Sequence, residues 1–201
     1  MRLMFIIILL TGIFTQLSAQ DLVTPRNKIG IKAGVNYSFM NFNRGYLASD
    51  PAIVNSWKPG LYVGALIQVP LNRYITLQTE YAFTWMRSED VRIKTAYNLS
   101  YLTLPLLLKL AVSQRIAVIA GPQFDLLVGA NKKNSGTVTG ITHDTEERNI
   151  SGVVAFEVNL VKSVFVDARY IHGFNHIGIG QRSSITEFKW QGVVIAAGVR
   201  F

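Results

Sequence analysis

Histidine and serine side chains near the end of the sequence are the residues whose types suggest catalysis or metal binding. His172 and His176 lie in the stretch HGFNHIGIG, and Ser183 and Ser184 follow a few positions later. Imidazole groups bind transition metals and act as general bases, and a serine beside such a base can be a nucleophile. No helix pattern fixes their spacing, and no third ligand is evident. We therefore expect neither a metal site nor a catalytic site and interpret these residues as polar loop residues.

No cofactor site is expected elsewhere. The glycine-containing stretches GTVTG and GIGQ lack the strand-to-helix context that a phosphate-binding loop requires. The remaining residues with chemical potential are charged side chains within otherwise apolar segments, at the positions that alternate with the apolar ones. These are Lys32, Glu80, Lys109, Asp125, Glu157, Asp167, Arg169 and Arg200.

In a β-strand, charged residues that alternate with apolar residues lie on one face of the strand. Charges that face a narrow protein interior must pair with one another or hold water, because an unpaired buried charge is costly. We predict that the eight residues form a polar network inside a barrel. A structural plug is the simpler interpretation of this network, and a proton or ion path is the alternative.

The composition indicates a protein that contacts lipid. Apolar residues make up 49% of the chain and charged residues 16%, whereas a typical soluble domain has roughly 25% charged residues. The mean hydropathy is +0.26, so the chain has too little charge for a surface that faces water throughout. The sequence contains no cysteine, which excludes the disulfide scaffolds common among small secreted domains.

The first residues have the pattern of an export signal. Arg2 precedes an apolar core that ends at Phe14, and small residues up to Ala19 precede a cleavage site. We predict a signal peptide over residues 1–19 and a barrel domain over residues 20–201. A membrane anchor is the alternative, although the core is shorter than the roughly 20 residues of a spanning helix. Loss of Arg2 lowers the net charge from +8 to about +7, which in an exported protein indicates lipid headgroups or acidic glycans rather than nucleic acid.

Hydrophobicity alternates with a period of two along eight segments. In residues 28–39, for example, the odd positions are all apolar, whereas the even positions are Lys, Gly, Asn and Ser. This period indicates β-strands with one apolar face, and about ten residues suffice for a tilted strand to cross a membrane. The predicted strands are 28–39, 61–69, 75–85, 101–110, 116–126, 150–160, 164–170 and 193–201.

The links between these strands alternate strictly in length. The long polar links are 40–56, 87–96, 129–148 and 173–186, and the short ones are 70–73, 112–115 and 161–163. We therefore predict an all-β fold, an eight-stranded antiparallel up-and-down transmembrane β-barrel in a Gram-negative outer membrane, with both termini periplasmic. A soluble barrel or sandwich is the alternative, but its outer face would carry more Lys and Glu than the Gly, Thr and Gln found here.

Aromatic residues near the ends of the predicted strands are typical of two interfacial belts. Those near the long links are Phe39, Trp57, Trp85, Tyr97 and Tyr170, and those near the short links are Tyr74, Phe165 and Phe201. The last strand also ends with Val199 and Phe201 on its apolar face. This ending resembles the signal that the barrel-assembly machinery reads, so we predict that machinery as a partner.

The segment YLTLPLLLKL, residues 101–110, contains six leucines but is interrupted by Pro105 and Lys109. With a period of two its even leucines face lipid, and Lys109 faces the lumen near the short-turn end. A proline cannot donate a backbone hydrogen bond, and a closed barrel has no free edge on which to place it. We predict a bulge, or a gap in the ladder filled by water, at Pro105.

Short motifs are spread over the predicted barrel domain. They are GIKAGVN at 30–36, YLTLPLLLK at 101–109, AGP at 120–122, Arg169-Tyr170 followed by Gly173, and the final Phe201. Together they resemble the PorT-like outer-membrane barrels of Bacteroidetes. Thr103 departs from the family, because an acidic residue often stands there. The resemblance implies an eight-stranded barrel, and the founding member participates in type IX protein secretion.

The sequence thus favours a non-enzymatic integral outer-membrane protein. Its expected partners are outer-membrane lipids, the barrel-assembly machinery and components of the secretion system, and an accessory role in type IX secretion is what the resemblance implies. One alternative is a surface-binding, adhesin-like barrel that acts through its long loops. The other is an enzyme that modifies lipids of the outer leaflet with His172 and His176.

Overall fold

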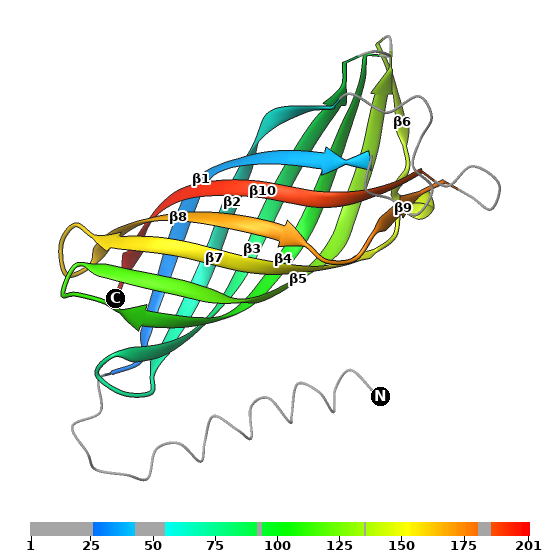
Figure 1. Ribbon diagram of the computed structural model, residues 1–201. Coiled ribbons are helices and arrows are strands. Elements are labelled where there is room, and N and C mark those ends of the chain that lie inside the picture. Colours follow the sequence, from blue (N-terminus) through cyan, green and yellow to red (C-terminus); the bar gives the residue numbers. More distant parts are fainter. Residues whose placement is uncertain (1–25, 43–54, 92–93, 135, 181–185) are drawn as a thin grey trace.

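Eight long strands form a closed antiparallel barrel in the computed structural model, which describes residues 26–42, 55–91, 94–134, 136–180 and 186–201. The predicted signal peptide and the Ser183–Ser184 pair lie outside these residues. The barrel strands are β1 (Lys28–Asn41), β2 (Asn55–Pro70), β3 (Ile75–Asp90), β4 (Thr95–Ala111), β5 (Ile116–Asn134), β7 (Arg148–Asn159), β8 (Val164–Gly173) and β10 (Thr186–Arg200). Each pairs with the next, and β1 pairs with β10 to close the barrel (Figure 1). The predicted fold is confirmed.

The apolar face of each strand points outward. In β4, Leu106 and Leu108 are 47% and 54% exposed, whereas Thr103 and Lys109 on the opposite face are 0% and 8% exposed. A band of exposed leucine, isoleucine, valine and phenylalanine side chains suits hydrocarbon and not water. In the described part of the chain, no helix is long and apolar enough to cross a membrane.

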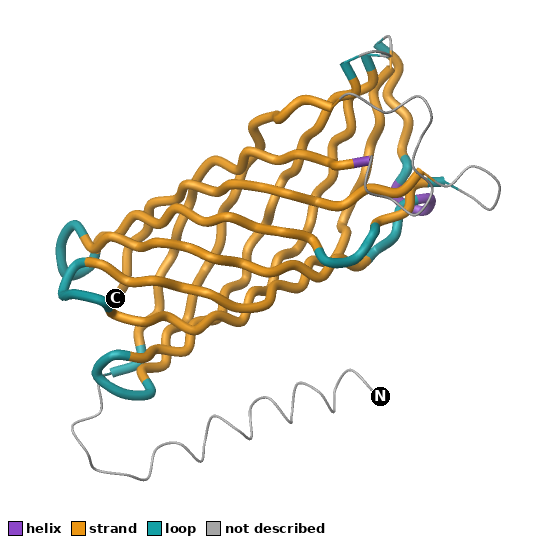
Figure 2. Tube along the Cα trace, viewed as in Figure 1, coloured by secondary structure: helices purple, strands orange, loops and turns teal. Residues whose placement is uncertain are grey.

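Several strands extend beyond their predicted ends at the long-loop end. β5 has 19 residues, so it spans about 60 Å of strand, more than a ~30 Å hydrocarbon core requires even at a tilt of about 45°. β3 and β4 meet between Asp90 and Thr95, so the predicted long link 87–96 is wrong. β5 turns back into the short strand β6 (Thr137–Gly140), and this hairpin forms part of the extension (Figure 2).

The remaining described parts of two long links pack against each other at this end. The 3₁₀ helix η3 (Thr142–Asp144) precedes β7, and the short strand β9 (Ile177–Ile179) pairs with β10. Glu146 N donates to Gly178 O at 3.0 Å, and Gly180 N donates to Asp144 O at 2.8 Å. These bonds tie the two links together.

Pro105 interrupts the β-ladders without changing their register. The pairs of β4 with β5 run from Pro105↔Gln123 directly to Leu108↔Ala120. The pairs of β3 with β4 leave out Leu104 and Pro105. The sum of the paired residue numbers is the same on both sides of each gap, so the predicted bulge is wrong and the ladder has a gap at this position. The water predicted to fill the gap stays a prediction. The register shifts lie between Trp57 and Leu61 and between Ser100 and Tyr101.

The aromatic belts are present at both ends, but two of the predicted members point inward. Tyr97 packs against the buried apolar residues of the lumen and contacts Phe42, with 5.5 Å between ring centroids, so its predicted place in the outer belt is wrong. At the long-loop end, Trp57 stacks on Phe39 with 5.4 Å between ring centroids. At the short-turn end, Tyr74 and Phe201 are 52% and 76% exposed. Phe165 is only 1% exposed, so its predicted place in the outer belt is wrong and its ring lies inside the barrel.

Candidate functional site

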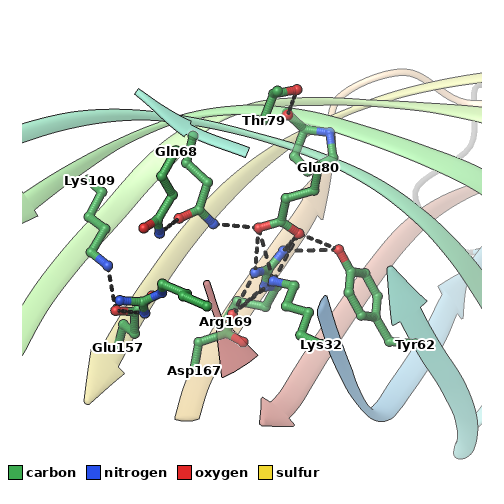
Figure 3. A network of polar contacts seen from close by, with 12 residues as sticks. Lys32, Tyr62, Gln68, Thr79, Glu80, Lys109, Glu157, Asp167 and Arg169 are labelled. Atoms are coloured by element: carbon green, nitrogen blue, oxygen red, sulfur yellow. Dashed lines mark hydrogen bonds and ion pairs between the residues drawn. The ribbon is translucent and has the colours of Figure 1, made fainter. Parts of the chain in front are cut away.

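A central ionic cluster crosses the middle of the lumen (Figure 3). Glu80 from β3 contacts Lys32 Nζ from β1 at 2.9 Å and Arg169 Nη2 from β8 at 3.1 Å. Asp167 accepts from the same arginine at 2.5 Å and lies 3.4 Å from Lys32 Nζ. Tyr62 OH donates to Glu80 Oε2 at 2.6 Å. All four charged side chains are at most 1% exposed, and two bases balance two acids, so the pairing offsets their desolvation.

The strands leave space for this cluster. Asp167 and Arg169 are two residues apart in β8, so both point to the same face. Lys32 pairs with Gly198 of β10 on one side and with Gly64 of β2 on the other. Since neither neighbour has a side chain, the long lysine side chain can cross the lumen.

A second group, which we call the mouth cluster, consists of Lys109, Glu157 and Arg200 near the short turns. Lys109 Nζ lies 2.5 Å from Glu157 Oε1, and Arg200 Nη2 forms an ion pair with the same carboxylate. Arg200 Nη1 also donates to Asn159 Oδ1 at 2.9 Å. The guanidinium stacks on the Phe165 ring, 4.0 Å from its centroid. These contacts hold Arg200 in one position.

Two glutamines extend the central cluster along the lumen (Figure 3). Gln68 Nε2 donates to Gln78 Oε1 at 2.6 Å, and Gln78 Nε2 donates to Glu80 Oε1 at 2.6 Å. Glutamine was not among the predicted network residues because the prediction considered only charged side chains. The inward position of both residues in their strands was the signal that could have identified them.

Asp125 is the exception among the eight predicted network residues. The other seven form ion pairs within the described chain, whereas Asp125 is held by amides. Gln123 Nε2 and Asn149 Nδ2 donate to its carboxylate at 2.9 Å and 2.8 Å. Asp125 is 1% exposed, so these donors replace its water.

The outer half of the lumen contains a layer of apolar side chains, which the sequence reasoning missed. We call this layer the apolar plug. It contains Trp190, the largest fully buried side chain, together with inward-facing residues of other strands and of the 141–147 segment. Representative members are Met40, Phe42, Met86, Leu99, Ile141, Ile171, Ile177 and Phe188. Met40 follows Lys32 by an even number of residues, so its inward position could have been predicted from parity.

His172 contacts polar and aromatic neighbours near the long-loop end. His172 Nδ1 lies 3.3 Å from Tyr170 OH and 3.3 Å from Gln191 Nε2, and its ring contacts Phe174 at 6.2 Å between centroids. His176 lies close in sequence but belongs to the loop before β9. Among the described residues, no group of three His, Cys, Asp or Glu side chains is placed to hold a metal ion.

Val199 and Phe201 lie at the short-turn end of the closing strand. Phe201 N donates to Ile29 O at 2.8 Å, which ties the last residue to β1. Val199 is half-buried, and the Phe201 side chain is 76% exposed, so both are available on the outer face. Their role in recognition by the assembly machinery stays a prediction.

Solved structures share this architecture. Ail, the attachment invasion locus protein of Yersinia pestis, is 13% identical over 88% of this chain and 100% of its own, with a TM-score of 0.52. Neisserial surface protein A is 10% identical over 87% and 97% of the two chains, with a TM-score of 0.52. The outer membrane protein AlkL, solved in DMPC bilayers, is 11% identical over 91% and 94%, with a TM-score of 0.53. At these identities the likeness shows the fold alone.

Sequence comparison identifies the family more directly. No curated protein matches the chain. The family model described as outer membrane protein beta-barrel domain matches residues 16–178, which is most of the chain. The match agrees with the closed barrel and its apolar outer band, and the chain belongs to the outer membrane protein β-barrel domain family.

Proposed function

We propose that the chain is a non-enzymatic scaffold protein that acts by contacts at its two ends, as an accessory component of type IX protein secretion. The observation that carries this proposal is the filled lumen. The mouth cluster, the central cluster and the apolar plug occupy successive levels of the interior, and an eight-stranded barrel has little room beyond its own side chains. The resemblance to PorT-like barrels supports the secretion role.

Two measurements test this function. In planar bilayers, the purified chain is expected to show no stable channel, whereas a porin reconstituted in parallel conducts. In cells, deletion of the gene is expected to leave type IX cargo unprocessed inside the periplasm, and the full chain supplied in trans restores secretion. Steady conductance contradicts the closed scaffold. Normal cargo secretion after deletion contradicts the accessory role.

We also propose that the short-turn end, with both termini, faces the periplasm. The sequence has no cysteine, so single cysteines report orientation without background. Lys133 lies on the exposed β5 extension, and Gln114 lies in an exposed short turn. Lys133→Cys is expected to react with an impermeant maleimide on intact cells. Gln114→Cys is expected to react only after the outer membrane is permeabilised, and the reverse pattern contradicts this orientation.

A surface-binding role through the loops is the second candidate. The observation that favours it is the β5–β6 hairpin, which extends beyond the part of the barrel that a membrane requires and carries Lys132 and Lys133 on exposed positions. Replacement of residues 131–140 by a short turn removes β6 and the last four residues of β5 and keeps β5 as far as Ala130. If cell-surface binding to host glycans is unchanged by this replacement, the adhesin-like role through this hairpin is wrong.

A further inference from the structure

The short-turn end of the barrel is hollowed by two adjoining pockets. The larger has a volume of about 590 Å³ and lies between the β4–β5 turn, the β7–β8 turn and the ends of β1 and β10. The smaller has a volume of about 210 Å³ and lies beside the β2–β3 turn. Lys28, Asn159 and Arg200 line both pockets. We call the two pockets together the basal basin.

The basal basin is lined by positive charge that its own carboxylate does not balance. Its bases are Lys28, Arg73, Lys109, Arg115, Lys162 and Arg200. Glu157 pairs with Lys109 and Arg200. Within the described chain, the other four bases have no ion-pair partner, and the exposed side chains of Lys28, Arg115 and Lys162 can turn toward a ligand.

Arg200 provides a fixed positive charge in this basin. Its side chain is 6% exposed and is held by Asn159, Glu157 and the Phe165 ring. Because Arg200 lines both pockets, its charge adds to the attraction of the basin for an anion.

The three short turns repeat one design around the basin. In each turn, two successive backbone amides donate to one carbonyl oxygen. In the β2–β3 turn, Leu71 N and Asn72 N donate to Ile75 O, and in the other two turns the acceptors are Ile116 O and Val164 O. The first residues of these turns, Leu71, Val112 and Leu160, are 56%, 63% and 58% exposed. Each turn also carries one base and no acid.

Acidic side chains are placed mostly at the opposite end of the barrel. Six of the described acids belong to the long-loop end, namely Glu89, Asp90, Asp144, Glu146, Glu147 and Glu187. The short-turn end therefore combines unpaired bases with exposed aliphatic side chains at its rim. This combination is suited to the headgroup layer of a membrane, where bases meet phosphate and apolar side chains meet the acyl boundary.

The geometry points to the basal basin as a binding site for a phosphate group. A phosphate presents several oxygens at once, so it can accept from flexible lysines that come from different parts of the chain while the fixed charge of Arg200 attracts it. The same chemistry is present in the headgroup of an anionic phospholipid and in a free phosphate compound. This inference uses only the short-turn end itself and does not rest on the secretion role.

The test uses the full chain in phosphatidylcholine nanodiscs, with pyrophosphate as the probe at constant ionic strength. Isothermal titration is expected to detect pyrophosphate binding that chloride does not reproduce. The double variant K28Q/K162Q is expected to bind on the order of tenfold more weakly or worse, since each base near a phosphate contributes appreciably. The matched control K132Q/K133Q removes the same charge from the long-loop end and is expected to bind like the wild type.

Phosphatidylglycerol nanodiscs distinguish the two sources of phosphate. If a lipid headgroup occupies the basin, pyrophosphate binding disappears in these discs, and native mass spectrometry finds phosphatidylglycerol retained by the wild type but not by K28Q/K162Q. If a free phosphate compound is the ligand, pyrophosphate binds equally in both kinds of disc. The inference is overturned if pyrophosphate binds no more than chloride in phosphatidylcholine discs, or if both double variants weaken binding equally.

Discussion

Replacing Arg169 with methionine is expected to lower the free energy of unfolding by about 3–5 kcal/mol, the usual cost of breaking a buried ion pair. Methionine keeps much of the side-chain length but removes the charge. Glu80 and Asp167, both at most 1% exposed, would then share only Lys32. Equilibrium unfolding by urea in lipid vesicles, followed by the fluorescence of the 3 tryptophans, measures the loss.

A second substitution separates charge balance from packing in this experiment. Adding Glu80→Gln to the Arg169 variant leaves one base, Lys32, against one acid, Asp167, so much of the lost stability is expected to return. Lys132→Met is the control for loss of a base, because Lys132 is exposed on the β5 extension. An Arg169 variant as stable as this control, or a double variant less stable than the single one, contradicts the stabilising role of the central cluster.

Replacing Trp190 with alanine is expected to cost about 3–5 kcal/mol, because it removes a large aromatic side chain from a packed interior. Trp190 is 0% exposed and is the largest fully buried side chain of the apolar plug. The strands around it cannot collapse into the space, since the barrel ladders fix their separation. The same urea unfolding experiment measures this change, and Trp190→Phe should cost markedly less.

Gly192 provides a specific control for the Trp190 prediction. A Cβ atom at Gly192 would lie 2.9 Å from Trp190 Cζ2, so the indole ring occupies the place of that side chain. Gly192→Ala is therefore expected to destabilise the wild type but to be neutral or stabilising in the Trp190→Ala background. Equal effects in both backgrounds would show that the indole ring does not fill this space.

The strands could be predicted from the sequence because a period of two is a local property. Outward residues such as Leu108 and inward ones such as Lys109 follow from parity alone. The inward side of Phe165 also follows, because it shares its parity with Asp167, and its assignment to the outer belt disregarded that rule. The extension of β3, β4 and β5 could not be predicted in this way, since strand pairing beyond the membrane depends on a partner strand and not on an apolar face.

The members of the lumen network were predictable, but their partners were not. Lys32 and Glu80 are 48 residues apart, and their contact depends on the stagger of β1, β2 and β3. Asp125 lies in the same alternation of apolar and polar residues as the ion-paired residues, yet its carboxylate accepts from the side-chain amides of Gln123 and Asn149 and not from a base. Sequence parity identifies which side chains enter the lumen, whereas the level at which they meet is set by the register of the complete barrel.

The pairing of β1 with β10 has a consequence for how the protein is made. Twelve pairs form this seam, from Gly30↔Arg200 to Asn41↔Lys189, so the barrel cannot close until β10 has been synthesised. Contacts between such distant segments form slowly because the intervening loop must be closed first. Until then β1 and β10 are unpaired edges, which cannot remain exposed in hydrocarbon. The two edges therefore have to remain covered until they pair with each other.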